Sequence, residues 1–392
     1  MPGRVILFGA TGYTGQLTAH ALADGAYGAN GTSGTSETSG AGGAAENPVA
    51  SVLLAGRNEA RVRALAEQLG FDWGVADVSE PHSIRALLNR GDVLVSTVGP
   101  FNRWGNAAVR AAIDAGAHYL DSTGEGRFIR EVFEVYGAQA NGAGCGLVTA
   151  FGYDWVPGNL AGALALAEAG EAGTRVRIGY FVTGGPMGPN ALSGGTRASA
   201  AGVLLDRAFA FRGGRLIDER PGRRVHRFEL RPGKRGSSLS VGSSEHLALP
   251  RVYPALEEVD VYLGWFGPAT RPFQALSGGL SALTRSAGAK RRMEALIARV
   301  EKGSSGGPDA VARGRGGSLV LAQALSAAGA QLSSVRLEGI NGYDFTARIL
   351  AWGARAAAAG GLQGTGALGP VDAFGLDSLR TGCEQAGIRR TQ

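Results

Sequence analysis

The chain has 392 residues, of which 44% are hydrophobic and 18% charged, a globular composition that excludes a disordered or collagen-like protein. Its length exceeds the roughly 100–200 residues of one ordinary domain, so we expect two domains. The net charge is +6, but the densest basic stretch, residues 212–235, contains acidic residues and alternates like a half-solvated strand, which argues against a nucleic-acid surface.

Cysteine usage and hydropathy indicate a protein of a reducing compartment. Cys145 and Cys383 lie far apart with no metal-ligand spacing around them, which disfavours a disulfide framework and a structural zinc site. No long apolar region follows Met1, and the best apolar run, residues 160–167, is much shorter than the ~20 residues of a membrane span. We therefore expect a soluble cytoplasmic protein without stable membrane insertion.

The first third of the chain alternates strand and helix signals. Apolar runs predict strands at 5–8, 52–55, 74–76, 92–98, 118–121 and 146–150, and helical patterns lie between them at 16–23, 59–69, 81–89, 106–115 and 128–138. Repeated βα units of this length require a parallel sheet with helices on both faces. Residues 27–48 consist mainly of Gly, Ser, Thr, Ala and Asn, so we expect a flexible surface insertion there.

The pattern changes after residue 174. Strands are predicted at 174–182, 225–231, 237–241, 259–263 and 334–338, with helices at 198–210, 289–301, 343–358 and 373–386 and a Gly/Ser-rich linker at 302–317. The predicted fold is α/β. It has an N-terminal domain of the Rossmann type, a doubly wound parallel sheet, over residues 1–154, and a second α+β domain over 155–342. Residues 343–392 are expected to form a helical segment that returns to the Rossmann domain.

Glycine is in excess, with 65 residues, and one glycine-rich segment has a specific meaning. The segment 9–15, Gly-Ala-Thr-Gly-Tyr-Thr-Gly, follows the first strand and opens a helix. Glycines there permit a tight turn and close backbone approach, so that a pyrophosphate can sit on the helix N-terminus. The spacing G-x-x-G-x-x-G differs from the strict dinucleotide fingerprint, and a purely structural turn is the alternative.

The ends of the following strands predict which dinucleotide binds. The second strand ends at Arg57 and Asn58 without a carboxylate for the ribose 2′-hydroxyl, and an arginine there favours the 2′-phosphate of NADP(H). The alternative is that Arg57 merely solvates a helix start. The residues expected to contact the cofactor are Gly9, Thr11, Gly12, Tyr13, Thr14, Gly15, Arg57, Asn58, Asp77, Val78, Thr97, Val98, Gly99 and Pro100.

Missing motifs narrow the reaction class. A short-chain dehydrogenase needs a Tyr-x-x-x-Lys pair, yet no lysine precedes Lys234 and none of the three lysines stands four residues after a tyrosine. His-Glu-x-x-His and phosphate-loop Gly-Lys-Ser/Thr motifs are also absent from the sequence. The five histidines are scattered and indicate no metal site.

The sequence resembles the saccharopine dehydrogenase-like oxidoreductases, and most closely the branch of trans-acting enoyl reductases. The resemblance covers most of the chain except residues 27–48 and 302–317, and it is carried by the segments 9–15, 55–57, 98–101 with Gly105, 117–125, 151–157, 193–196 and 342–347. It implies a Rossmann domain, a second domain inserted before a returning C-terminal segment, and a pyridine nucleotide between the two.

The resemblance implies reduction of a small molecule but leaves the bond open. Reduction of an activated C=C in a polyketide, lipid or secondary-metabolite intermediate is favoured. Reduction of a C=N bond in an amino-acid adduct is the alternative. A third possibility is a non-catalytic regulator that senses NADP(H) without turnover. A homodimer is left open, and no nucleic-acid partner is expected.

Candidate proton donors lie where strands end or domains meet, since ligands of open α/β sheets bind at the carboxyl ends of strands. Tyr153 and Asp154 stand at the expected domain junction, and Asp121 and Glu125 follow the fifth strand. Each has a structural alternative, because Asp121 can cap a turn and Tyr153 can be a packing aromatic. We predict Tyr153, Asp154 and Glu125 as catalytic residues.

Overall fold

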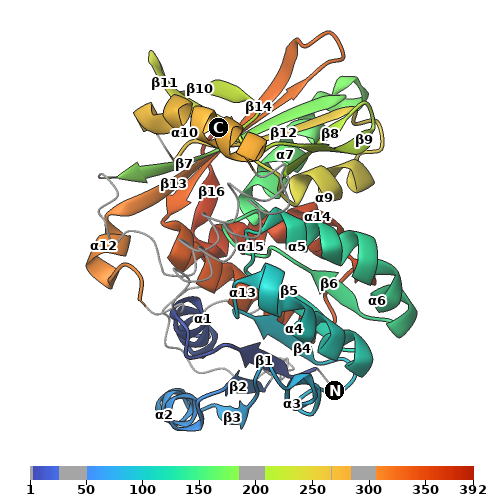
Figure 1. Ribbon diagram of the computed structural model, residues 1–392, viewed down its shortest axis with the longest axis vertical. Helices are drawn as coiled ribbons and strands as arrows, with labels where there is room; N and C mark the ends of the chain where they lie inside the picture. The colour runs from blue at the N-terminus through green and yellow to red at the C-terminus, as the bar shows by residue number, and fades with distance from the viewer. Residues whose placement is uncertain (1–2, 26–50, 185–207, 266, 284–305) are drawn as a thin grey trace, which may run out of the picture.

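The structure is a computed structural model that describes residues 3–25, 51–184, 208–265, 267–283 and 306–392. The predicted insertion at 27–48, the predicted helix at 289–301 and most of the predicted helix at 198–210 lie outside these residues. Two sheets, one below the other in Figure 1, organise the described chain.

Sheet A contains seven parallel strands and confirms the doubly wound Rossmann fold. Its order is β15-β6-β5-β4-β1-β2-β3, the arrangement that places a crossover helix on each face. The strands are β1 (Val5–Phe8), β2 (Val52–Gly56), β3 (Asp72–Val75), β4 (Val93–Ser96), β5 (His118–Asp121), β6 (Gly146–Val148) and β15 (Gly366–Ala367).

Both faces of sheet A are buried, which explains why its central strands are apolar without alternation. Val5 and Leu7 of β1 belong to one apolar cluster, whereas Ile6 and Phe8 belong to another on the opposite face. The helices of this half are α1 (Tyr13–Ala23), α2 (Glu59–Leu69), α3 (Pro81–Arg85), α4 (Phe101–Ala115), α5 (Gly126–Glu131), the π-helix η1 (Val132–Tyr136) and α6 (Gly137–Ala143).

Sheet B is a mixed sheet of nine strands that forms the other half of Figure 1. Its main path is β10-β11-β12-β7-β13-β14-β16, β8 pairs with β12 and β9, and only the β12–β7 pair is parallel. The strands are β7 (Arg175–Gly184), β8 (Ala208–Arg212), β9 (Arg215–Glu219), β10 (Val225–Arg231), β11 (Lys234–Ser240), β12 (Glu258–Leu263), β13 (Gly316–Leu325), β14 (Gln331–Ile340) and β16 (Ile388–Arg390).

One apolar core runs through both sheets. It contains side chains of β1 and β4 from sheet A, of β7 and β14 from sheet B, and of two long helices between them. The remaining helices are α7 (Val156–Ala169), η2 (Gly170–Ala172), α9 (Glu245–Val252), η3 (Gly267–Ala269), α10 (Thr270–Leu283), α12 (Ala310–Gly314), α13 (Gly342–Ala358), α14 (Pro370–Phe374) and α15 (Leu376–Ala386). Because the core is continuous, the division at 154/155 and 342/343 stays a prediction.

Three sequence-based element predictions need correction. Residues 310–317, expected to belong to a linker, form α12 and the start of β13, and residues 208–210, expected to end a helix, begin β8. The glycines near residue 316 serve close strand approach rather than flexibility, since a Cβ on Gly317 would lie 2.5 Å from Thr183 Oγ1 of β7. The C-terminal segment is not only helical, because it adds β15 to sheet A and β16 to sheet B.

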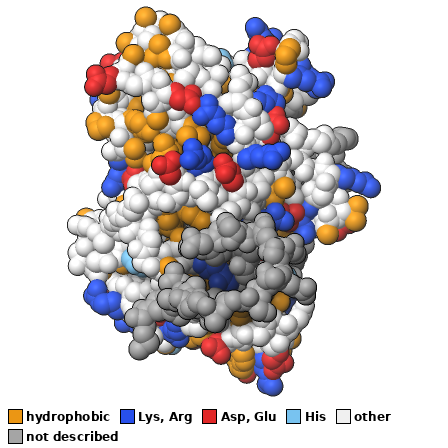
Figure 2. All heavy atoms as spheres, turned by 180° about the vertical axis from the view of Figure 1, so that it is seen from behind, with side chains coloured by type: hydrophobic (Ala, Val, Ile, Leu, Met, Phe, Trp, Pro, Cys, Tyr) orange, Lys and Arg blue, Asp and Glu red, His pale blue; other side chains and the backbone are white. Residues whose placement is uncertain are grey.

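The described surface mixes charges of both signs. Figure 2 shows basic and acidic side chains interspersed on the face turned away from Figure 1, rather than separated into fields of one sign. No helix among the described residues is long and apolar enough to cross a membrane.

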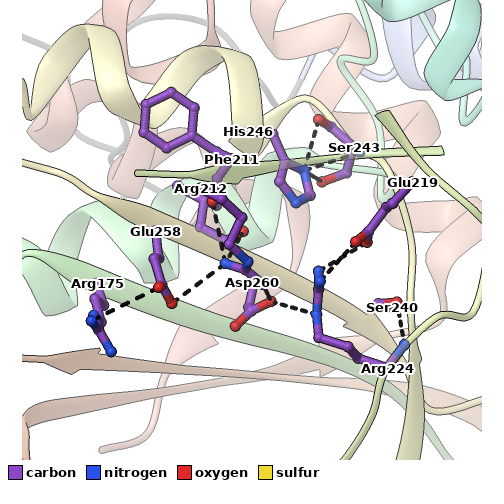
Figure 3. A network of polar contacts seen from close by, with 11 residues as sticks. Arg175, Phe211, Arg212, Glu219, Arg224, Ser240, Ser243, His246, Glu258 and Asp260 are labelled. Carbon is purple, nitrogen blue, oxygen red and sulfur yellow. Dashed lines mark hydrogen bonds and ion pairs between the residues drawn. The ribbon is translucent and has the colours of Figure 1, made fainter. Parts of the chain in front are cut away.

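A chain of alternating charges joins four strands of sheet B and the residue before β10 (Figure 3). Asp260 of β12 stands at its centre, paired with Arg212 and, at 3.3 Å, with Arg224. Arg224 continues to Glu219 at 2.7 Å. On the other side Glu258 lies 3.6 Å from Arg212 and 3.8 Å from Arg175. The Asp260 side chain is only 12% exposed, and those of Arg212 and Arg224 are 19% and 30% exposed. Water therefore solvates these charges only in part.

We expect Asp260→Asn to lower the free energy of unfolding by about 1–3 kcal/mol, because it removes the negative charge that Arg212 and Arg224 share in a half-buried site. Chemical denaturation of both proteins measures the difference. The matched control is Asp377→Asn, which alters a 90% exposed partner of Arg380 and should change nothing measurable. Equal stability of Asp260→Asn and the wild type would show that the charge chain does not contribute to stability.

Candidate functional site

The glycine loop lies where the sequence predicts it, between the end of β1 and the first turn of α1. Gly9 has a φ of +87°, a left-handed conformation that favours glycine, and its N–H donates to the Ala55 carbonyl of β2 at 2.9 Å. A side chain at Gly15 would place its Cβ only 2.1 Å from the Gly9 carbonyl oxygen. The glycines therefore let the helix begin directly beneath the loop.

The N-terminus of α1 fits the pyrophosphate of a dinucleotide. Its N-cap residue, Gly12, supplies no side-chain cap, and the helix dipole gives this end a partial positive charge. Phosphate oxygens accept hydrogen bonds from the backbone N–H groups of such a turn. Added Cβ atoms at Gly9 and Gly15 would collide with Val98 and with the Gly9 carbonyl oxygen, so this tight turn needs glycine. The helix N-terminus that the turn leaves without a side-chain cap fits the predicted group.

The end of β2 presents an arginine to solvent. Arg57 is exposed and has neither a hydrogen bond nor an ion pair within the described part of the chain. Asn58 is the N-cap of α2 and accepts the N–H of Arg61 at 3.0 Å. Arg61 in turn donates to the Thr11 carbonyl of the glycine loop at 3.2 Å, a contact that the sequence did not reveal. Arg57 is thus the cation left available for a phosphate at this strand end.

The end of β3 lies beside Arg57. Asp77 accepts hydrogen bonds from the N–H and the hydroxyl of Ser79, both at 2.8 Å. These two bonds, and then the charge of Arg57, hold the pKa of Asp77 below its usual range. Val78 is half-buried against the apolar cluster of sheet A. Asp77 is therefore an anchored turn residue near the position expected for the adenosine.

The end of β4 touches the glycine loop directly. Thr97 donates from its hydroxyl toward the Phe8 and Gly9 carbonyl oxygens, at 3.2 Å each. A Cβ on Gly9 would lie 2.7 Å from Val98 Cγ2. The chain then passes through Gly99 to Pro100, the N-cap residue of α4. The structure therefore brings the predicted pyrophosphate and nicotinamide-ribose segments together.

Glu125, predicted as a catalytic residue, caps a helix. It is 4% exposed, and its two carboxylate oxygens accept the N–H groups of Phe101 and Asn102 at 2.9 Å each. This places a negative charge at the N-terminus of α4, where the helix dipole stabilises it. Glu125 thereby fixes the start of α4 behind Gly99 and Pro100, and its role as a proton donor stays a prediction.

Asp121 ties the ends of two strands together. Its carboxylate accepts hydrogen bonds from Thr149 Oγ1 at 2.7 Å, Ala150 N at 2.8 Å and Thr123 N at 2.9 Å. Burial raises its pKa to about 6, although these hydrogen bonds act in the opposite direction. These three contacts join the ends of β5 and β6, and a role of Asp121 as proton donor stays a prediction.

Tyr153 and Asp154 lie where the chain passes from sheet A to α7. The Tyr153 N–H donates to Thr346 Oγ1 at 2.9 Å, and its phenol donates to the Phe181 carbonyl of β7 at 3.4 Å. Burial raises the pKa of that phenol. Asp154 keeps some exposure as a residue, but its Oδ1 atom is inaccessible and has no hydrogen-bond partner among the described residues.

The carboxyl group of Asp154 has the properties of a proton donor. Burial raises its pKa to about 7, so that the acid carries its proton near neutral pH. A Cβ on Gly124 would lie 3.0 Å from Asp154 Oδ2, so glycine leaves room for the carboxyl group. No group of three or more His, Cys, Asp or Glu in the described ranges could hold a metal ion.

Two residues beside this junction were not predicted as part of the site. Glu245, the first residue of α9, and Tyr180 of β7 meet at 2.7 Å between Glu245 Oε1 and the phenol oxygen. They are 65 residues apart in the chain. A single acid at the start of a helix is an ordinary first-turn residue, so the sequence does not single out Glu245. The fold shows that Glu245 and Tyr180 are both buried and that the charge of Asp154 acts on Tyr180.

Tyr13 of the glycine loop connects to sheet B. Its phenol donates to the Pro308 carbonyl at 2.5 Å and accepts from Arg313 of α12 at 3.3 Å, and its ring packs against Tyr343 with centroids 5.2 Å apart. Arg313 also pairs with Asp344 of α13 at 2.7 Å. We call these five residues the Tyr13 clasp, which joins the glycine loop to the segments before β13 and at the start of α13.

Comparison with known proteins agrees with this geometry. Residues 43–143 match the family described as the saccharopine dehydrogenase NADP binding domain. The chain is 34% identical over 175 residues to a trans-acting enoyl reductase of Mycobacterium ulcerans (strain Agy99), across 43% of this chain and 37% of that protein. A trans-acting enoyl reductase of Mycobacterium tuberculosis (strain ATCC 25618 / H37Rv) is 34% identical over 161 residues, across 40% and 34%. The matches span little more than a third of these relatives' length.

The whole described fold has solved counterparts. Apo saccharopine dehydrogenase (L-Glu forming) from Saccharomyces cerevisiae aligns with a TM-score of 0.59 at 14% identity, covering 99% of both chains. A homospermidine synthase from Legionella pneumophila in complex with NAD aligns with a TM-score of 0.56 at 10% identity, covering 100% of this chain and 92% of that one. Residues 43–143 therefore match an NADP-binding domain of the saccharopine dehydrogenase type, and the fold of the chain is similar to that of saccharopine dehydrogenase.

Proposed function

We propose that the protein is an NADPH-dependent reductase that acts on an activated C=C bond of an enoyl-type intermediate. The observation that supports this most is the glycine loop at the uncapped start of α1, with Arg57, which has no partner among the described residues, at the next strand end. The C=C bond is favoured over a C=N bond because the enoyl reductases share 34% of matched residues with this chain, whereas saccharopine dehydrogenase shares 14% and its likeness shows the fold alone. A small-molecule substrate, a homodimer and a cytoplasmic location stay predictions.

NADPH bound across the carboxyl ends of the strands of sheet A would supply a hydride. The chain's own residues bind and orient: α1 would receive the pyrophosphate, Arg57 the 2′-phosphate, and residues 97–100 the nicotinamide ribose. Glu125 holds the start of α4 behind Pro100 and so fixes that last segment. The remaining task is to deliver one proton to the substrate atom next to the carbon that accepts the hydride.

Asp154 is the best placed of the predicted donors. The phenol of Tyr153 holds its proton too firmly, since burial raises its pKa further, and both oxygens of Glu125 are occupied by backbone N–H groups. Asp154 has an unpartnered oxygen, partial exposure and a pKa raised to about 7. Its O–H bond would break as the new C–H bond of the product forms, leaving a carboxylate that solvent reprotonates.

A substrate panel tests the activity. We expect the purified protein to oxidise NADPH with at least one α,β-unsaturated thioester or enone, and more slowly with imines, as followed by the loss of reduced nicotinamide absorbance. Turnover of imines alone would reassign the reaction to C=N reduction. Tight NADPH binding without turnover of any compound would instead support the sensing regulator.

We expect Arg57→Ala to weaken NADPH binding by roughly 10- to 100-fold while leaving NADH binding unchanged, because one charge-assisted contact to the 2′-phosphate contributes about 1.5–3 kcal/mol. Isothermal calorimetry with both nucleotides measures this. Arg63→Ala is the matched control, since Arg63 lies on α2, the helix that follows Arg57, but pairs with Glu67 at 2.8 Å. An unchanged preference in Arg57→Ala would exclude Arg57 as the phosphate ligand.

We expect Asp154→Asn to lower kcat by about 10²-fold or more without changing the Kd for NADPH, because it removes the transferable proton and not the nucleotide site. Tyr153→Phe and Glu125→Gln serve as comparisons in the same steady-state assay. If Asp154→Asn keeps the wild-type kcat and one of the other two variants loses it, the donor is that other residue.

A further inference from the structure

Four buried polar atoms without partners gather where the chain enters α7. They are Asp154 Oδ1, Trp155 Nε1, Asn159 Oδ1 and Glu245 Oε2, and none has a hydrogen-bond partner among the described residues. Buried polar groups are nearly always paired, so a group of unpaired ones points to a functional site. Two of these atoms belong to the carboxyl groups of Asp154 and Glu245, and the reaction proposed above uses only that of Asp154.

The hydrogen count around Tyr180 favours a protonated Glu245. The Tyr180 phenol oxygen accepts the N–H of Gly158 at 2.8 Å and lies 3.1 Å from the Trp155 carbonyl and 2.7 Å from Glu245 Oε1. A phenol has one hydrogen, and neither a carbonyl nor a carboxylate brings another. An ionised Glu245 would therefore leave one of these two oxygen–oxygen contacts without a hydrogen. A protonated Glu245 donates to Tyr180, which donates to Trp155, and every contact is satisfied.

The surroundings of Glu245 disfavour a charge. The residue is 0% exposed, and the groups from the described residues that act on it are Tyr180 of β7, Ser243 before α9 and Asp154, none of which is a cation. Burial raises the pKa of Glu245 to about 8, and the nearby Asp154 carboxyl adds to the shift. The close approach is built into the backbone, since a Cβ on Gly158 would lie 2.1 Å from the phenol oxygen and 2.3 Å from Glu245 Oε1.

We infer that Asp154 and Glu245 form a buried pair of neutral carboxylic acids, in which Glu245 is a positioning residue that holds Tyr180 and keeps Asp154 in its proton-bearing form. The inference rests on the proposed function, because it gives the proposed donor a partner. A charge on either acid opposes ionisation of the other, so the two titrate as a coupled pair. The neutral pair avoids burying a carboxylate that has no counter-ion.

An infrared pH titration of the full-length protein, without nucleotide or substrate, tests the pair. We expect the carbonyl stretch of protonated carboxyl groups to persist at neutral pH and to disappear in two steps as the pH rises. Asp154→Asn and Glu245→Gln each remove one step and shift the remaining step to lower pH, since the opposing charge is gone. The control Glu219→Gln alters a buried carboxyl that binds Arg224 through both oxygens, at 2.7 and 2.9 Å, and leaves the neutral-pH band unchanged.

Thermal unfolding gives a second readout that needs no spectral assignment. Both acids have a higher pKa in the folded chain than the ~4 of an unfolded carboxyl, so folding is favoured by their protonation. Their stabilising contribution is complete below about pH 4 and is lost as the pH rises through about 7 to 8. We expect the wild-type Tm to fall more steeply between pH 5 and pH 9 than the Tm of the double variant Asp154→Asn/Glu245→Gln.

The outcomes separate this inference from the proposed reaction. A wild-type spectrum without an acid band at pH 6, or a band that neither variant alters, overturns the neutral pair. If Asp154→Asn loses its infrared step but keeps the wild-type kcat, the neutral pair is supported and only the role of Asp154 as donor is contradicted. A pH–kcat profile of Glu245→Gln that shifts in the same direction as the infrared step supports the action of Glu245 through Asp154.

Discussion

From Val156 to Leu166 helix α7 is buried on all sides, and its packing sets the geometry on which the rest of the site depends. The helix contacts β7, β13 and β14 of sheet B as well as α9, α14 and α15, and Ala167 and Glu168 of its last turn are exposed. A surface helix buries one apolar stripe, whereas this part of α7 is buried on every face. Gly158 and Gly162 permit this packing, since side chains there would overlap Tyr180 and Ile178.

The burial of α7 creates two different electrostatic environments at the carboxyl edge of sheet A. Beyond β2 and β3, Arg57 is exposed, and two hydrogen bonds from Ser79 hold the pKa of Asp77 below its usual range. Beyond β5 and β6, burial raises the pKa of the Asp121 and Asp154 carboxyl groups. The two ends of this row of strand termini therefore differ in how costly it is to ionise a carboxyl group.

Part of this organisation is readable from the sequence. The loop 9–15 and the apolar runs of the first six strands are local signals, and the structure places them in one parallel sheet as predicted. Strand β13 was not predicted because its Gly-Gly-Ser start resembles a linker. The strand nevertheless lies at the centre of sheet B, between β7 and β14. The environment of Glu245 depends on contacts with residues 65 to 91 positions away, which no local pattern encodes.

The Tyr13 clasp has a thermodynamic consequence. Tyr13 opens α1 directly after the glycine loop, and its phenol is held by Pro308 and Arg313, a few residues before β13. Its ring packs against Tyr343 at the start of α13. One side chain therefore contributes to the free energy that orders the glycine loop, the entry to β13 and the start of α13, so its removal would weaken all three at once.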